Sequence, residues 1–289
     1  MEKVSPGSVL LCIFTAGLFA VSILTSKFVY QYGVEPLFFS TVRSVFCVAM
    51  CSAFILVKGG EWRMPKPARA YILPMCVMLL MVSFGYPTAM KYIPAGLATL
   101  VFYLWPMFVL IISATQQREF PGIRRFSIFA VAFAGLGLVF GPAIGDVRWE
   151  GLAAATIAAL GASLFCVIVP KVTRHASSMT INIHTNVVVG LILFGGAVLD
   201  DQLQMPTAAI GWYAMIGAGL LYGLGMIMIF YAINRAGPVT SSILFNSEPL
   251  IVTLLATVIF AEILEPVQYA GILIVVVSMM LASARTAVK

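Results

Sequence analysis

Two charged side chains lie inside apolar stretches, where a bare charge is costly. Glu248 follows Pro238 by ten residues, so in a helix it lies about 15 Å from the helix start. Arg43 follows Pro36 by seven residues, which places it about 10 Å deep. A charge in the middle of a bilayer costs at least ~2.5 kcal/mol, so both groups need water or a partner.

Each of these two residues has a functional and a structural interpretation. The carboxyl group of Glu248 accepts an ammonium group or a coupled proton, or it stays protonated against backbone atoms freed by Pro249. The Arg43 guanidinium binds a carboxylate in a central cavity, or its long side chain extends to the outer interface. Together the two residues would suit a zwitterion.

Aromatic side chains in the same stretches could hold an apolar or aromatic ligand. Trp105 stands about as deep as Glu248, away from the interfacial belts where tryptophan is enriched. Its ring could stack on a ligand or pack between helices. Tyr86, Tyr103, Tyr222 and Tyr231 each offer a hydroxyl group and a ring, either to a ligand or to ordinary packing.

Two prolines interrupt the helices that carry these residues. Pro106 removes the hydrogen bond to the carbonyl of Phe102, and Pro249 removes the one to the carbonyl of Phe245. Unpaired backbone at membrane depth is tolerated only inside protein or beside water. We therefore expect bends at both prolines, which could act as hinges, and we include both phenylalanines in the candidate site.

The chain that holds these residues is too apolar for a water-soluble surface. Of its 289 residues, 61% are hydrophobic and 10% are charged, whereas a soluble domain carries about 25% charged residues. Because a helix needs about 20 residues to cross a bilayer, the apolar stretches predict ten spans in an all-α integral membrane protein. The spans cover residues 8–30, 36–57, 71–90, 95–115, 123–141, 151–170, 180–199, 209–233, 238–260 and 267–285.

The basic residues are unevenly distributed between the two sets of loops. With the N-terminus in the cytoplasm, 13 of the 17 basic residues fall on that side, namely Lys3, Lys58, Arg63, Lys66, Arg69, Arg118, Arg124, Arg125, Lys171, Arg174, Arg235, Arg285 and Lys289. The positive-inside rule then predicts cytoplasmic N- and C-termini in a bacterial inner membrane. Because these residues are scattered over short loops, the net charge of +6 does not indicate nucleic-acid binding.

The two halves of the chain share a pattern at an offset of 143 residues. The stretch 89–106 aligns with 232–249, and their prolines coincide. We predict two five-helix repeats, 1–145 and 146–289, in one integrated membrane domain around a central cavity. Because five is odd, the second repeat is inverted relative to the first, which is a construction typical of secondary transporters.

Two short motifs carry a resemblance to a known family. The segment Phe102-Tyr-Leu-Trp-Pro106 resembles the Tyr-Leu-Trp-Pro segment of bacterial aromatic amino-acid exporters, and nearly the whole chain resembles the ten-helix, EamA-type members of the drug/metabolite transporter superfamily. The pair Glu248-Pro249 resembles a motif common across the broader family and departs from the closest aromatic amino-acid exporters. The resemblance implies export of amino acids or related metabolites by alternating access.

Small and polar residues within the spans are interpreted as packing groups. Gly219-x-x-x-Gly223 and Gly137-x-x-x-Gly141 lie in apolar spans, so they indicate close helix contacts rather than a nucleotide-binding loop. Asn182 and Asn186 are four residues apart and share a helix face, where we expect them to hydrogen-bond between helices.

The sequence lacks the short motifs that mark several classes of enzyme. No Walker A, His-Glu-x-x-His or Gly-x-Ser-x-Gly segment occurs, so we expect no enzymatic activity, no cofactor and no metal ion. A broad exporter of toxic cationic or aromatic drugs, a passive channel and a lipid-modifying membrane enzyme are the alternatives. The expected partners are a small-molecule substrate and the lipid bilayer, in a form compatible with a monomer.

Overall fold

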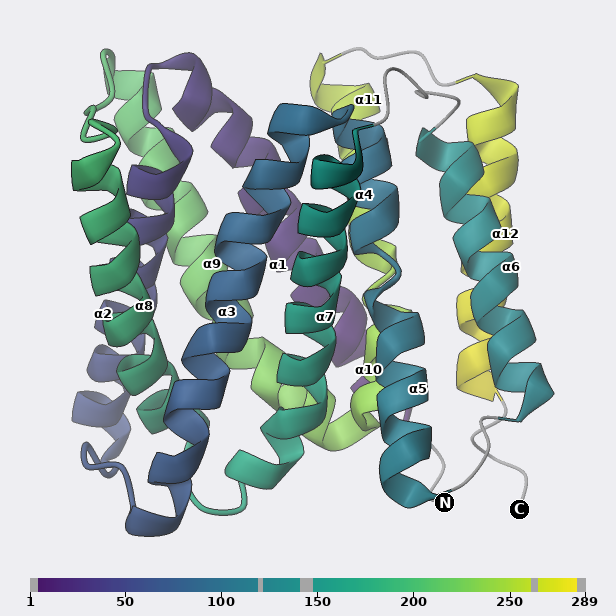
Figure 1. The fold of residues 1–289 in the computed structure, drawn as a ribbon, viewed down its shortest axis with the longest axis horizontal. Helices are drawn as coiled ribbons and strands as arrows, with labels where there is room; N and C mark the ends of the chain where they lie inside the picture. The colour runs from purple at the N-terminus through teal and green to yellow at the C-terminus, as the bar shows by residue number, and fades with distance from the viewer. Residues whose placement is uncertain (1–4, 119–121, 141–147, 261–264, 285–289) are drawn as a thin grey trace. The chain divides into compact units, whose positions relative to one another are not determined.

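A computed structural model describes residues 5–118, 122–140, 148–260 and 265–284, which form twelve α-helices (Figure 1). In chain order these are α1 (Pro6–Gln31), α2 (Pro36–Lys58), α3 (Lys66–Tyr92), α4 (Ala95–Phe102), α5 (Trp105–Gln117), α6 (Ile123–Phe140), α7 (Trp149–Val172), α8 (Ser178–Leu199), α9 (Ala209–Ala236), α10 (Pro238–Leu244), α11 (Ser247–Phe260) and α12 (Pro266–Ala284).

Every predicted span coincides with one helix or with two consecutive half-helices. Among the described residues, eight stretches are long and apolar enough to cross a membrane, and the shorter apolar helices Phe126–Val139 and Pro266–Ser278 lie within α6 and α12. The predicted all-α membrane fold is thereby confirmed. The spans 95–115 and 238–260 are each broken, into α4 with α5 and into α10 with α11.

The chain forms two compact units, and each unit draws on both halves of the sequence. Unit 1 comprises the described residues of Met1–Phe14, Met78–Pro170 and Ala232–Lys289, and unit 2 comprises Thr15–Val77 and Lys171–Tyr231. The chain passes from one unit to the other within α1, α3, α7 and α9.

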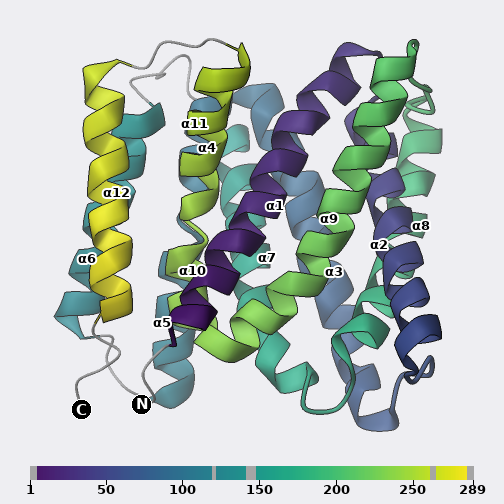
Figure 2. The ribbon, with the colours of Figure 1, turned by 180° about the vertical axis from the view of Figure 1, so that it is seen from behind.

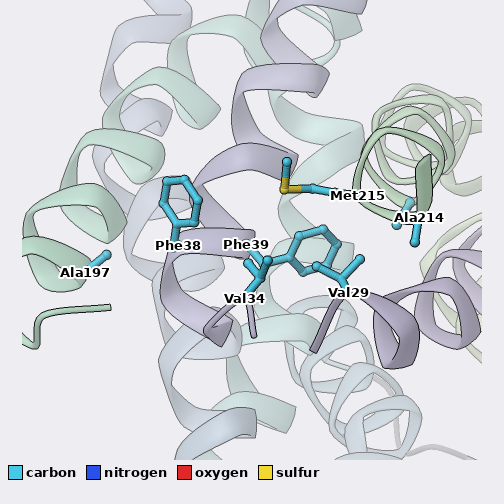
Figure 3. Packing of buried hydrophobic residues seen from close by; sticks show 8 residues of the cluster. Val29, Val34, Phe38, Phe39, Ala197, Ala214 and Met215 are labelled. Atoms are coloured by element: carbon cyan, nitrogen blue, oxygen red, sulfur yellow. The ribbon is translucent and has the colours of Figure 1, made fainter. Parts of the chain in front are cut away.

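In unit 2, α2 packs along α8, as the two views show (Figures 1 and 2). A buried hydrophobic cluster joins α1, α2, α8 and α9 (Figure 3), and it consists of Val29, Val34, Phe38, Phe39, Ala197, Ala214, Met215 and Ala218. In a bilayer, close packing rather than expulsion of water holds such helices together.

Small and polar residues tie the helices of unit 2 together, as predicted for Asn182 but not for Asn186, whose Nδ2 donates to the carbonyl of Asn182 within α8 at 3.0 Å. The Asn182 side chain donates from Nδ2 to the carbonyl of Met226 at 3.1 Å and so links α8 to α9. At Gly223 of α9, an added Cβ would lie 3.3 Å from the Cα atom of Cys47 in α2. The close helix contact expected for the motif Gly219-x-x-x-Gly223 is therefore confirmed.

In unit 1, α6 packs along α12, and α7 lies against the unit 1 part of α3. The backbones of α6 and α12 approach closely, because a Cβ added at Gly271 would lie 2.6 Å from the carbonyl oxygen of Gly135. A Cβ added at Gly161 of α7 would lie 2.7 Å from the carbonyl oxygen of Met78. These glycines set the distance between neighbouring helices.

One predicted helix contact is wrong, and some predictions fall outside the described residues. No described residue lies within 4 Å of a Cβ added at Gly137, so the described helices do not pack closely there, and its predicted partner Gly141 is not described. The boundary between the predicted repeats at 145/146 also lies outside the described residues, as do Lys3, Arg285 and Lys289.

Candidate functional site

Two helix breaks in unit 1 position most of the predicted site residues. The first half-helix α4 ends at Phe102, and the turn of Tyr103 and Leu104 leads into α5. The second, α10, ends at Leu244, and the turn of Phe245 and Asn246 leads into α11. The first break is visible in Figure 1 and the second in Figure 2. Both breaks fall at equivalent places in the two halves of the sequence.

The prolines stand in the first turn of the second half-helix, where a missing N–H costs least. Pro106 is the second residue of α5, and Pro249 is the third residue of α11. The carbonyl of Phe245 accepts the N–H of Glu248 at 3.0 Å. The prediction that Pro249 leaves this carbonyl free is therefore wrong, because the turn supplies a nearer donor. The prolines restart a helix rather than bend a continuous one.

Glu248 is the second residue of α11 and is partly buried beside the break. A side-chain hydrogen bond links its carboxyl group to the hydroxyl of Tyr103, which is buried in the turn after α4. Two half-helices that are far apart in the sequence therefore contribute to one polar contact. A carboxyl group held in this way, among apolar side chains, can accept an ammonium group or a proton.

Aromatic rings surround this contact within unit 1. The Tyr86 hydroxyl shares a hydrogen bond of 2.7 Å with the hydroxyl of Thr99, and the Tyr86 ring lies 5.0 Å from that of Phe102. The ring of Phe102 meets the ring of Tyr103 edge to face at 5.6 Å. Tilted and edge-to-face rings at these distances pack favourably and form an apolar wall.

Trp105 and Phe245 form a second aromatic contact between the two breaks. Their ring centroids lie 6.2 Å apart, and both side chains are buried, with 7% and 4% of their surface exposed. Six of the seven predicted binding residues thus belong to unit 1 and gather at its two helix breaks: Tyr86, Phe102, Tyr103, Trp105, Phe245 and Glu248.

Arg43, the seventh predicted residue, lies in unit 2. Its guanidinium carbon lies 5.1 Å from the ring centre of Phe39 and 4.9 Å from that of Tyr222, and Nη2 donates to the Ser40 hydroxyl at 3.0 Å. Its Nε is buried and has no hydrogen-bond partner among the described residues. Such a guanidinium, fixed by two rings and with an Nε donor that the described residues leave unpaired, is suited to bind an anion.

Some residues of these sites were not predicted. Asn246 lies in the α10–α11 turn with 1% of its surface exposed, and the 143-residue offset, which aligns it with Tyr103, was the signal that could have identified it. Phe39 and Ser40 gave no signal of their own, because a phenylalanine and a serine are ordinary in an apolar span.

Comparison with known proteins places this architecture in a family. The model of the EamA-like transporter family matches the chain twice, over residues 7–141 and 149–284. The chain belongs to the EamA-like transporter family. The EamA match covers both halves and includes both helix breaks, and it identifies the protein as a multi-pass membrane transporter.

Individual relatives of this EamA chain are distant. It is 23% identical to GDP-fucose transporter 1 of Dictyostelium discoideum, over 90% of this chain and 74% of the relative. It is 22% identical to an uncharacterized transporter of Archaeoglobus fulgidus, over 85% and 86% of the two chains. It is also 22% identical to protein PagO of Salmonella typhimurium, over 78% and 77%.

A solved crystal structure has the same fold. It superposes with a TM-score of 0.84 at 19% sequence identity, over 97% of this EamA chain and 99% of the other. At this identity the likeness describes the fold and carries no information about the substrate.

Proposed function

We propose that this EamA family member is a secondary transporter that exports amino acids or related small metabolites across the bacterial inner membrane by alternating access. The observation that carries the proposal is the hydrogen-bonded pair of Glu248 and Tyr103 at the two helix breaks of unit 1. Discontinuous helices at membrane depth are the usual place for substrate and ion sites in transporters.

The chemistry of the side chains supports the substrate class. The carboxyl group of Glu248 suits an ammonium group, and the rings of Tyr86, Phe102 and Tyr103 suit an apolar or aromatic body. In unit 2, the guanidinium of Arg43 suits a carboxylate. A relative named as a GDP-fucose transporter supports a small polar metabolite as cargo in this family.

The architecture supports an inverted-repeat mechanism. The family model matches each half of the sequence once, and the broken helices occur at equivalent places in the two halves. We propose that residues 1–145 and 146–289 are inverted five-helix repeats, with both termini in the cytoplasm. The breaks before Pro106 and Pro249 would then act as hinges during the transport cycle.

A broad exporter of cationic drugs is the second candidate. A carboxyl group near aromatic rings also suits a hydrophobic cation that lacks a carboxylate, and the site in unit 1 contains these groups. Such a protein would protect cells against toxic dyes and would release no amino acid.

The proposal is tested by comparing the metabolites that cells release into the medium. Overexpression of the wild-type protein should enrich small molecules that carry an amino group, relative to cells with an empty vector. Glu248→Gln should lower this release at least about tenfold, because a hydrogen bond to a charged group contributes about 1.5–3 kcal/mol. Glu265→Gln changes an exposed acid before α12 and is the matched control. Release of dyes alone, or no enrichment, would contradict the proposal.

A further inference from the structure

Asn246 is a buried polar side chain whose hydrogen-bonding groups are unused. It lies in the turn between α10 and α11, and 1% of its surface is exposed. Neither its Oδ1 nor its Nδ2 has a hydrogen-bond partner within the described part of the chain. A carboxamide can make several hydrogen bonds, so its burial without any is unfavourable for stability.

Asn246 lies in one of the two helix breaks that carry the candidate site of unit 1. Asn246 precedes Glu248 by two residues in the same break, and the ring of the preceding residue, Phe245, packs on Trp105. In the first half of the chain, the equivalent position is occupied by Tyr103, whose hydroxyl bonds to Glu248. The neighbouring serines are satisfied, since the hydroxyls of Ser242 and Ser247 donate to the carbonyls of Val239 and Leu244, both at 2.8 Å.

Burial without hydrogen-bond partners is not general among the asparagines of this chain. Asn182 in α8 is equally buried, with 1% of its surface exposed. Its Nδ2 donates to the carbonyls of Ser178 and Met226, both at 3.1 Å, so it has a structural role between helices. Asn246 has no such role in the described structure.

We propose that Asn246 is a specificity-determining residue that binds the α-amino acid group of the substrate. Its Oδ1 would accept from the ammonium group, alongside Glu248, and its Nδ2 would donate to the adjacent carboxylate. A donor and an acceptor on one rigid carboxamide match the two groups that an α-amino acid carries on one carbon. A simple amine offers only one of them. This inference rests on the proposed function and narrows its substrate class to α-amino acids.

The test measures both stability and selectivity for three variants. Asn246→Leu removes both hydrogen-bonding groups, Asn246→Asp retains an acceptor and removes the N–H donors, and Asn182→Leu is the matched control for loss of a bonded asparagine. Melting temperatures are measured on the purified, substrate-free proteins. The ratio of α-amino acids to amines without a carboxylate is measured in the medium of expressing cells.

We expect Asn246→Leu to melt at or above the wild-type temperature and Asn182→Leu to melt several degrees lower. The ratio of released α-amino acids to simple amines should fall at least about tenfold in both Asn246 variants, because a site built to hydrogen-bond a group rejects ligands strongly when that bond is lost.

Two results would overturn the inference. One is a loss of melting temperature in Asn246→Leu as large as that in Asn182→Leu, which would indicate a structural role. The other is an unchanged ratio of released compounds. Failure of the proposed function itself is distinguished from these, since the wild-type protein would then release no more than the empty vector.

Discussion

At the scale of single residues, the site combines groups that a lipid-facing helix would exclude. Glu248 and Tyr103 were both predicted from the sequence, Glu248 because a carboxyl group is costly in an apolar run and Tyr103 because it offers a hydroxyl group and a ring there. Their hydrogen bond was not predictable, because it depends on the helix breaks that bring the two turns together. Asn246 went unrecognised because a single neutral amide gives a weak signal in the sequence.

Removal of the Tyr103 hydroxyl should weaken transport without unfolding the protein. Tyr103→Phe keeps the ring that packs on Phe102 and removes the group that bonds to Glu248. A hydrogen bond to a charged group contributes about 1.5–3 kcal/mol, so the transport rate should fall roughly tenfold or more. Flux into proteoliposomes measures this, with Tyr269→Phe on an exposed position of α12 as the control. An equal loss of flux in both variants would contradict a specific role of the Tyr103 hydroxyl.

Replacement of Arg43 by lysine should weaken substrate binding although the positive charge is retained. Arg43→Lys removes the planar guanidinium that lies over the rings of Phe39 and Tyr222. Each contact contributes about 0.5–1 kcal/mol, so the apparent affinity for a carboxylate-bearing substrate should fall roughly fivefold to thirtyfold. Arg148→Lys is a close control, because Arg148 also lies over a ring, that of Tyr92, but is exposed. Unchanged affinity in Arg43→Lys would show that Arg43 does not bind the carboxylate of the substrate.

At the scale of helices, hydropathy predicted the position of each span to within a few residues at its ends, but not where two of the spans break. A proline indicates a lost hydrogen bond, and we therefore expected bent helices with free carbonyls. The structure instead has two-residue turns, and the Phe245 carbonyl is paired with the N–H of Glu248. Local pairing within a turn depends on backbone geometry, which the residue types do not determine.

Close helix packing predicts different effects on stability when Gly161 and Gly217 are each replaced by alanine. A Cβ at Gly161 of α7 would lie 2.7 Å from both the Met78 carbonyl oxygen and the Met81 Cβ, whereas a Cβ at Gly217 of α9 would meet nothing within 4 Å. Gly161→Ala should therefore destabilise the protein by about 1–3 kcal/mol. Gly217→Ala should be neutral or stabilising, by up to about 1 kcal/mol, since alanine favours helix. Thermal unfolding in detergent compares them, and equal melting temperatures would contradict the close α3–α7 contact.

At the scale of the whole molecule, the chain is an EamA-type membrane transporter whose two compact units each combine segments from both halves of the sequence. The sequence offset of 143 residues predicted a duplication, and α2 and α6 pack along α8 and α12, the helices at equivalent positions in the second half. The composition of the units could not be predicted, because it depends on which helices pack together in three dimensions.

The proposed orientation in the membrane is tested by labelling single cysteines. All five native cysteines are buried, so they should react slowly with a membrane-impermeant maleimide. Gln204→Cys, in the loop between α8 and α9, should be labelled in intact cells because we propose that this loop lies outside. Glu61→Cys, between α2 and α3, should be labelled only after permeabilisation. The reverse pattern would show that the termini are not cytoplasmic.

The most direct test of the proposed transport function concerns the carboxyl group of Glu248. Purified wild-type protein, Glu248→Gln and Glu265→Gln are reconstituted at equal amounts into proteoliposomes, and the uptake of the amino acid most enriched in the release experiment is measured under a substrate gradient. We expect wild-type rates for Glu265→Gln and a rate at least about tenfold lower for Glu248→Gln, which corresponds to about 1.4 kcal/mol. Wild-type flux in folded Glu248→Gln would contradict the proposed role of Glu248.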